Sequence, residues 1–136
     1  MSTPSVNLEV LTEEECRTLL GSHPVQIGRI AFAHDGRILV LPLNYRLHRG
    51  GIVFRTEAGS SVDALADGTT VSFQIDSVDP TWQEGWSVLV EGSLTEVADP
   101  AERRALDALP LRSWAPGMRE RTYRIEPTAL NGRRIV

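Results

Sequence analysis

The stretch IVFRTEAGSS, residues 52–61, predicts an apolar strand, a short polar turn and the start of a helix. The strand ends on Arg55 and Thr56, and the turn leads through Gly59 and Ser60 into the first helical turn. An arginine fork, hydroxyl groups and the free backbone N–H groups of a helix N-terminus are donors that bind a phosphate group. The stretch therefore indicates a phosphate site where the strand ends.

The same residues also fit an ordinary helix cap. Ser60 and Asp63 have the spacing of a capping box, S-x-x-D, in which side chains satisfy backbone N–H groups of the first turn. We expect this helix to cover residues 60–67 and to stop at Asp67-Gly68. Capping alone accounts for the pattern as well as phosphate binding does, so both interpretations stay open on these residues.

Length and composition narrow the range of functions. The chain of 136 residues is expected to form a single domain, residues 1–136, with one core. A formal net charge of −4 argues against nucleic acid as a partner, and no apolar run is long enough to span a membrane. The N-terminus has no signal-peptide pattern and Cys16 is the single cysteine, which favours a cytoplasmic protein. All fourteen basic residues are arginine.

Apolar periodicity and turn signals predict a small, mainly β (α+β) barrel with short helices. The strongest turn signal is Asp35-Gly36, which joins two strands in a hairpin. Glu126-Pro127 is expected to interrupt the last strand. The predicted elements are helix 12–20, strands 25–33, 37–45, 51–56 and 69–76, a loop over 77–85, strand 86–97, a helix from Asp99-Pro100 to Pro110, and a last strand over 123–125 that resumes at 132–136.

The strand over residues 37–45 is apolar on both faces, with Leu39 and Leu41 on one side and Ile38 and Val40 on the other. In a chain of this length, one face can line the barrel interior, but the other needs a second subunit or a cofactor. The strand therefore predicts an interface as well as a core.

Five motifs in register make the chain resemble the pyridoxamine 5′-phosphate oxidase-like flavoproteins, in their short, nitroimidazole-reductase-like branch. The resemblance extends over almost the whole chain, and five motifs together are far more specific than any one. They are GRIAF at 28–32, PLNY at 42–45, FRTEAGSS at 54–61, GWSVLVEG at 85–92 and GRRI at 132–135.

This resemblance implies a six-stranded split β-barrel of the FMN-binding type, which forms a homodimer with FMN sites at the dimer interface. The phosphate and ribityl chain would lie along the FRTEAGSS motif, the ring edge along the PLNY motif, and the GWSV motif would approach from the partner subunit. The implied cofactor-binding residues are Phe54, Arg55, Thr56, Gly59, Ser60, Ser61, Pro42, Leu43, Asn44, Trp86 and Ser87.

Two positions depart from the family pattern: Ser61 stands where the motif has lysine, and Gln74, a milder change, stands where the family commonly has glutamate. A charge-assisted contact is worth about 1.5–3 kcal/mol, so the affinity for a phosphate could fall by roughly one or two orders of magnitude. Three outcomes are open: weaker FMN binding, FMN held by another arginine, or a different cofactor such as the deazaflavin F420. The C-terminal arginines, including Arg121, could attract an anion, although ion pairs within the protein are the commoner role.

The leading hypothesis is a flavin-dependent oxidoreductase that acts on an unidentified small molecule by hydride or electron transfer through the flavin N5. No catalytic side chain is predicted, and the histidines lack the spacing of a metal site. The substrate would lie near Trp82, Trp86 and the segment 109–118. Two alternatives remain: a flavin-binding store or sensor without turnover, and a dimer with an empty pocket.

Overall fold

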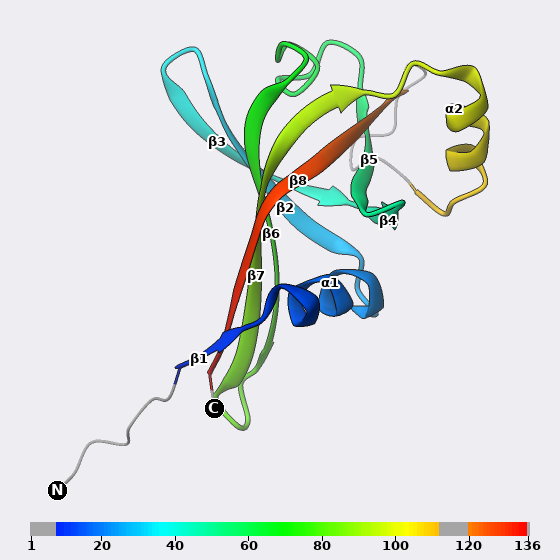
Figure 1. Cartoon of the computed structure of the whole chain (residues 1–136). Coiled ribbons are helices and arrows are strands. Elements are labelled where there is room, and N and C mark those ends of the chain that lie inside the picture. Colours follow the sequence, from blue (N-terminus) through cyan, green and yellow to red (C-terminus); the bar gives the residue numbers. More distant parts are fainter. Residues whose placement is uncertain (1–7, 112–119, 136) are drawn as a thin grey trace, which may run out of the picture.

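Three long strands, β6 (Thr69–Asp79), β7 (Glu84–Glu96) and β8 (Glu120–Ile135), form the middle of a curled antiparallel sheet (Figure 1). The computed structural model describes residues 8–111 and 120–135. The strand order is β3-β2-β6-β7-β8-β5-β4, and β1 pairs with the C-terminal end of β8. The remaining strands are β1 (Leu8–Leu11), β2 (Ile27–His34), β3 (Arg37–Asn44), β4 (Arg46–His48) and β5 (Gly51–Glu57).

The sheet curls into a half-barrel, which confirms the predicted split-barrel class. The described residues form eight strands and not six, because the short strands β1 and β4 add to the sheet. The predicted hairpin turn is confirmed: Asp35 and Gly36 have φ of 49° and 72°, the left-handed pair of a type I′ turn.

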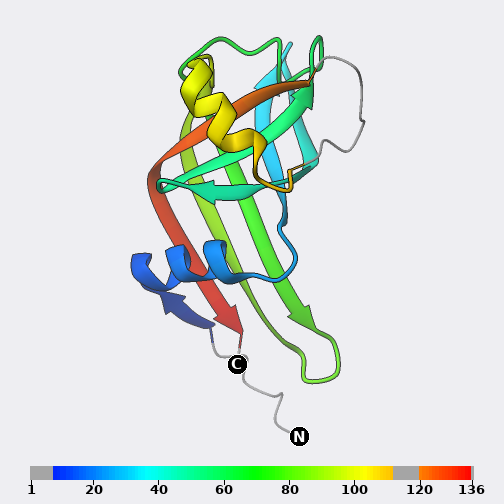
Figure 2. The ribbon, with the colours of Figure 1, turned by 90° about the vertical axis from the view of Figure 1, so that its right-hand side faces the viewer.

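Side chains that alternate along the strands build the core. Phe73 and Ile75 on β6 are fully buried, as the sequence pattern predicts. Phe54 on β5 faces this main core, whereas its neighbour Val53 faces a second cluster beneath helix α2. That helix, α2 (Pro100–Asp107), lies across β5 and β8 in Figure 2 and contributes Leu106.

Helix α1 (Glu13–Ser22) begins as the sequence predicts. The Thr12 Oγ1 accepts from the Glu15 N–H at 3.1 Å, and the Glu15 carboxylate accepts from the Thr12 N–H at 3.1 Å. Cys16 and Leu20 pack from this helix into the main core. Neither helix of the described residues is long and apolar enough to cross a membrane.

The predicted loop over residues 77–85 is wrong, because pairing between β6 and β7 continues to Asp79 and Glu84. Only residues 80–83 turn. The predicted interruption at Glu126-Pro127 is also wrong: β8 is continuous, and a register shift opposite Glu91 and Gly92 absorbs the proline. A proline lacks the N–H that a regular ladder requires, and a bulge removes that requirement.

The helix expected over residues 60–67 is absent, and a series of turns takes its place. The Ser60 Oγ does accept from the Asp63 N–H at 3.2 Å, so half of the predicted cap forms. The Asp63 carboxylate, however, bonds to the Gly59 N–H and not to the Ser60 N–H that a capping box would use, and it also bonds to Tyr123 on β8. Tertiary hydrogen bonds therefore override the local helix signal here.

Candidate functional site

Arg55 and Thr56, the first two predicted phosphate ligands, point to opposite faces of β5 because neighbours on a strand alternate. Arg55 lies on the α2 side, where its Nη2 is 2.6 Å from the Asp107 Oδ1 and its Nη1 donates weakly to the Leu111 carbonyl at 3.5 Å. Its side chain is 16% exposed. The arginine therefore already faces a carboxylate of the chain.

Thr56 lies on the main-core side and is 8% exposed. Its Oγ1 is 3.0 Å from the Ser60 Oγ, so two of the predicted hydroxyl donors bond to each other. Ser61 is half-buried and makes no hydrogen bond to any other residue of the described chain. Phe54 is fully buried and stacks on Tyr123, with ring centroids 5.9 Å apart, so its ring supports the strand from inside.

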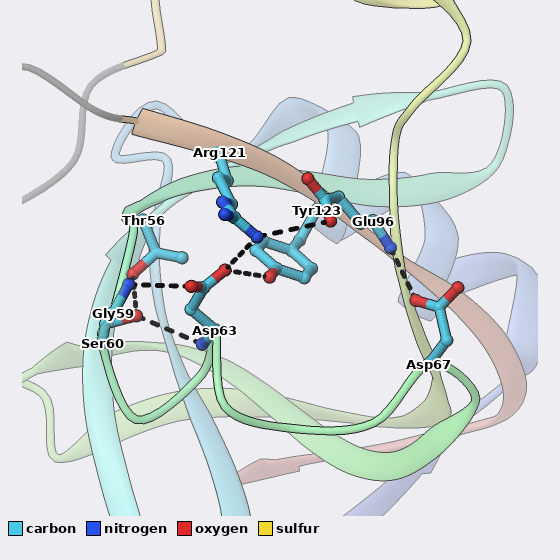
Figure 3. Close-up of polar contacts among 8 residues, drawn as sticks. All are labelled: Thr56, Gly59, Ser60, Asp63, Asp67, Glu96, Arg121 and Tyr123. Atoms are coloured by element: carbon cyan, nitrogen blue, oxygen red, sulfur yellow. Dashed lines mark hydrogen bonds and ion pairs between the residues drawn. The ribbon is translucent and has the colours of Figure 1, made fainter.

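Asp63 occupies the centre of the turn that follows β5 (Figure 3). Its Oδ2 accepts from the Gly59 N–H at 2.7 Å, and its Oδ1 accepts from the Tyr123 hydroxyl at 2.5 Å and lies 3.4 Å from the Arg121 Nη1. Gly59 has φ of 85°, which favours glycine and aims its N–H at the carboxylate. A backbone N–H, a phenol and an arginine form an anion-binding set of donors.

The electrostatics of Asp63 and Tyr123 follow from this contact. The Tyr123 hydroxyl and the Gly59 N–H lower the pKa of Asp63, because both donate to the ionised carboxylate. Burial raises the pKa of Tyr123, and the hydrogen bond to Asp63 raises it further. At neutral pH the pair is therefore a carboxylate and a neutral phenol.

The roles of Asp63, Arg121 and Tyr123 were not predicted as a set. From the sequence, Asp63 is predicted to be part of a helix cap and Arg121 to belong to a basic cluster. The spacing R-x-Y on a strand puts both side chains on one face, and this was the available signal. The sequence does not show which residues these two side chains contact, because that depends on the pairing of β5 with β8, in which Thr56 is opposite Arg121.

The residues of the PLNY motif, 42–45, lie in different surroundings. Leu43 is 6% exposed and belongs to the main core, whereas Pro42 is exposed on the outer face of the sheet. Asn44 lines a cavity of about 370 Å³, and Pro110 of the segment after α2 closes it on another side. The next residue, Leu111, accepts from Arg55, so this cavity adjoins the Arg55 end of β5.

Trp86 and Ser87 lie at the other end of the sheet, near the turn between β6 and β7 (Figure 1). They line a mainly apolar cavity of about 600 Å³ together with Arg133 and Ile135. Trp86 also packs edge-on against His23, with ring centroids 5.1 Å apart. Within one chain the structure does not bring this set together with Arg55 and Ser60.

Of the remaining predicted features, Trp82 is 72% exposed on the turn after β6. Trp114 and residues 112–118 lie outside the described residues. In residues 8–111 and 120–135, no group of three His, Cys, Asp or Glu side chains could hold a metal ion.

Comparisons with known proteins agree with these motifs. The family model described as pyridoxamine 5′-phosphate oxidase matches residues 12–134. The uncharacterized protein Rv0080 of Mycobacterium tuberculosis is 33% identical over 131 residues, which cover 93% of this chain and 84% of that protein.

Solved structures are similar over nearly their whole length. The FAD binding protein from Mycobacterium smegmatis is 31% identical, with a TM-score of 0.80 over 93% of this chain and 98% of that one. A candidate pyridoxamine 5′-phosphate oxidase from Corynebacterium glutamicum is 27% identical, with a TM-score of 0.78 over 99% and 96% of the two chains.

Proposed function

Because the chain belongs to the pyridoxamine 5′-phosphate oxidase family, we propose that it binds a flavin and acts as a flavin-dependent oxidoreductase on a small molecule. The observation that carries the proposal is the division of the predicted site. The residues predicted to bind the phosphate lie at the end of β5 and in the turn after it, whereas the apolar cavity lined by Trp86 lies near the turn between β6 and β7. A cavity of about 600 Å³ falls in the range of small-molecule sites.

A homodimer would join the two halves if its two-fold axis is perpendicular to the long strands, because such an axis places one end of a chain beside the opposite end of its partner. The outer face of β3 supports this proposal. Ile38 and Val40 on that face are 81% and 59% exposed, whereas Leu43 is buried against the core. Exposed apolar side chains that share one sheet face favour an interface with another protein surface.

In this arrangement the residues of the chain bind and orient the flavin. Arg55 would face its phosphate region, and the backbone of Pro42 to Asn44 would meet the ring edge. Ser60 would lie near the ribityl chain, and Thr56, on the opposite face of β5 from Arg55, would act through its hydrogen bond to Ser60. Trp86 and Ser87 of the second copy would cover the ring and exclude water. The bound flavin would supply hydride or electron transfer, so no acid or base of the chain need react.

The form of the flavin is the finer part of the proposal. The sequence motif predicts FMN, with F420 as the alternative, and the Mycobacterium smegmatis relative is named for FAD. A store or sensor without turnover is the second candidate function. Two features favour it: Asp107 already pairs with Arg55, and Ser61 carries no charge, so both weaken the attraction for a phosphate. A weakly held cofactor exchanges readily, as a store or sensor requires.

The visible absorption spectrum of the purified protein tests flavin binding, followed by release and identification of the cofactor. We expect a flavin spectrum that bleaches when NAD(P)H or reduced F420 is added without oxygen. A bound flavin that no donor reduces would favour the store or sensor. A colourless protein that takes up neither FMN, FAD nor F420 would refute the proposal.

Arg55→Ala tests the placement of the phosphate. It should weaken flavin binding about tenfold or more, because a charge-assisted contact is lost. Arg17→Ala is the matched control, since Arg17 is a 50% exposed arginine of α1 that pairs with Glu13. Equal affinities of the two variants would show that Arg55 does not contact the cofactor.

A further inference from the structure

The turn after β5 already holds an anion that belongs to the chain. Asp63 takes the Gly59 N–H, the Tyr123 hydroxyl and the Arg121 guanidinium, and its side chain is only 10% exposed (Figure 3). These are the donors that a phosphate at Gly59 and Ser60 would use. An external phosphate must therefore share them with a carboxylate.

The cations around Asp63 leave no excess positive charge that would attract a second anion to the turn. Arg121 faces Asp63 at 3.4 Å and Glu96 at 3.9 Å. On the other face of β5, Arg55 is paired with Asp107 at 2.6 Å. Ser61 adds no charge. Within residues 8–111 and 120–135, the two cations near the turn, Arg55 and Arg121, therefore already have acidic partners.

The charge of the incoming phosphate then decides how strongly it is repelled. A phosphate monoester, such as the end of FMN, carries about −1.5 to −2 at neutral pH because its second pKa is near 6. A phosphodiester carries a single charge, and a diphosphate divides two charges between two phosphates. Coulomb repulsion grows with the charge and falls with distance, so Asp63 opposes a monoester dianion about twice as strongly as a phosphodiester, and more strongly than a diphosphate of which only one phosphate lies at the turn.

We propose that Asp63 is a specificity-determining residue, which makes the turn over residues 57–63 favour a singly charged phosphate over the doubly charged phosphate of FMN. This inference rests on the proposed flavin binding and narrows it to a cofactor whose phosphate is a diester or part of a diphosphate. FAD, with a diphosphate, and F420, with a phosphodiester, share this chemistry. The hydrogen bonds to Asp63 fix its carboxylate in place, so the discrimination is built into the turn itself.

Titration of the purified, cofactor-free protein with FMN, FAD and F420 tests the inference, with Asp63→Asn as the variant. The wild type should bind FAD or F420 more tightly than FMN, and the comparison of those two identifies the source of the phosphate. In D63N the Kd for FMN should fall about tenfold more than the Kd for the other two.

Asp67→Asn is the matched control, because Asp67 lies between the turn and β6 and its substitution makes the same change of charge. Its Oδ1 accepts from the Glu96 N–H at 3.1 Å and points away from Asp63 (Figure 3). D67N should keep the wild-type ratio of affinities. A D63N ratio equal to the wild-type ratio, or a wild type that prefers FMN, would overturn the inference and leave flavin binding intact.

Two further measurements keep the inference testable if D63N is unstable or if no flavin binds. Arg121→Gln removes a cation from the same turn and should shift the ratio the opposite way, against FMN. Inorganic phosphate, followed through the NMR shift of the Gly59 amide, reports on the turn without flavin. We expect tighter phosphate binding in D63N than in D67N, and equal binding would refute the role of Asp63 whatever the cofactor.

Discussion

Replacing Tyr123 by Phe removes one hydroxyl from the Asp63 contact and keeps the ring that stacks on Phe54. The lost bond is short, 2.5 Å, and its acceptor is a carboxylate that is only 10% exposed. A hydrogen bond to a charged group is worth about 1.5–3 kcal/mol, and Asp63 keeps two of its three donors. We expect Y123F to lower the free energy of unfolding by about 2 kcal/mol at pH 7.

This loss should depend on pH, because it requires an ionised Asp63. The folded state lowers the pKa of Asp63 below its ordinary value of 3.8. A lowered pKa contributes stability that is complete above the ordinary value and is lost as the pH falls through the folded-state pKa. The difference between wild type and Y123F should therefore be full at pH 7 and should shrink below about pH 4.

Urea unfolding between pH 7 and the acid range measures this difference, and Tyr45→Phe is the control. The Tyr45 hydroxyl donates to the uncharged Leu20 carbonyl at 2.8 Å, so Y45F should cost about 1 kcal/mol with no acid dependence of the loss. If Y123F cost less than about 0.5 kcal/mol, or kept its full loss in acid, the anion-binding account of the turn would be refuted.

Two further substitutions test the core and the proposed interface. Gly28→Ala should lower the free energy of unfolding by about 1–3 kcal/mol, because the new methyl group would overlap the Phe73 ring and lie 2.9 Å from the Gln74 carbonyl oxygen. The control, Gly21→Ala in α1, should be neutral or stabilising, because the nearest atom is 3.4 Å away, and equal urea midpoints of the two variants would contradict this packing. Val40→Glu should change the free energy of unfolding of the monomer by less than about 0.5 kcal/mol, yet light scattering should show that the dimer dissociates. Ala105→Glu, on the exposed side of α2, should leave the dimer intact, and a V40E variant that is still a dimer would place the interface elsewhere.

The sequence predicted correctly those helix starts and turns that depend on neighbouring residues alone. The capping box of Thr12 and Glu15 begins α1, and Asp35-Gly36 turns the first hairpin, as expected. The helix over residues 60–67 failed because the side chain of Asp63 bonds to β8, which is distant in sequence. No short window contains both partners of that bond.

The extent of the strands and the surroundings of the site depend on pairing between distant segments. Pro127 is tolerated within β8 because a bulge forms opposite Gly92, and neither residue alone indicates this. The sequence motif suggested that Arg55 and Thr56 act together, but the pleat of β5 sends them to opposite faces. The acidic partner of Arg55 comes from α2, about fifty residues later in the chain.

Native mass spectrometry of the flavin-loaded protein measures whether two copies of the chain complete each flavin site. We expect a dimer that carries two flavins, and a V40E monomer that carries none. A monomeric chain that retains its own flavin would contradict the divided site, and a dimer that never acquires a flavin would contradict flavin binding itself.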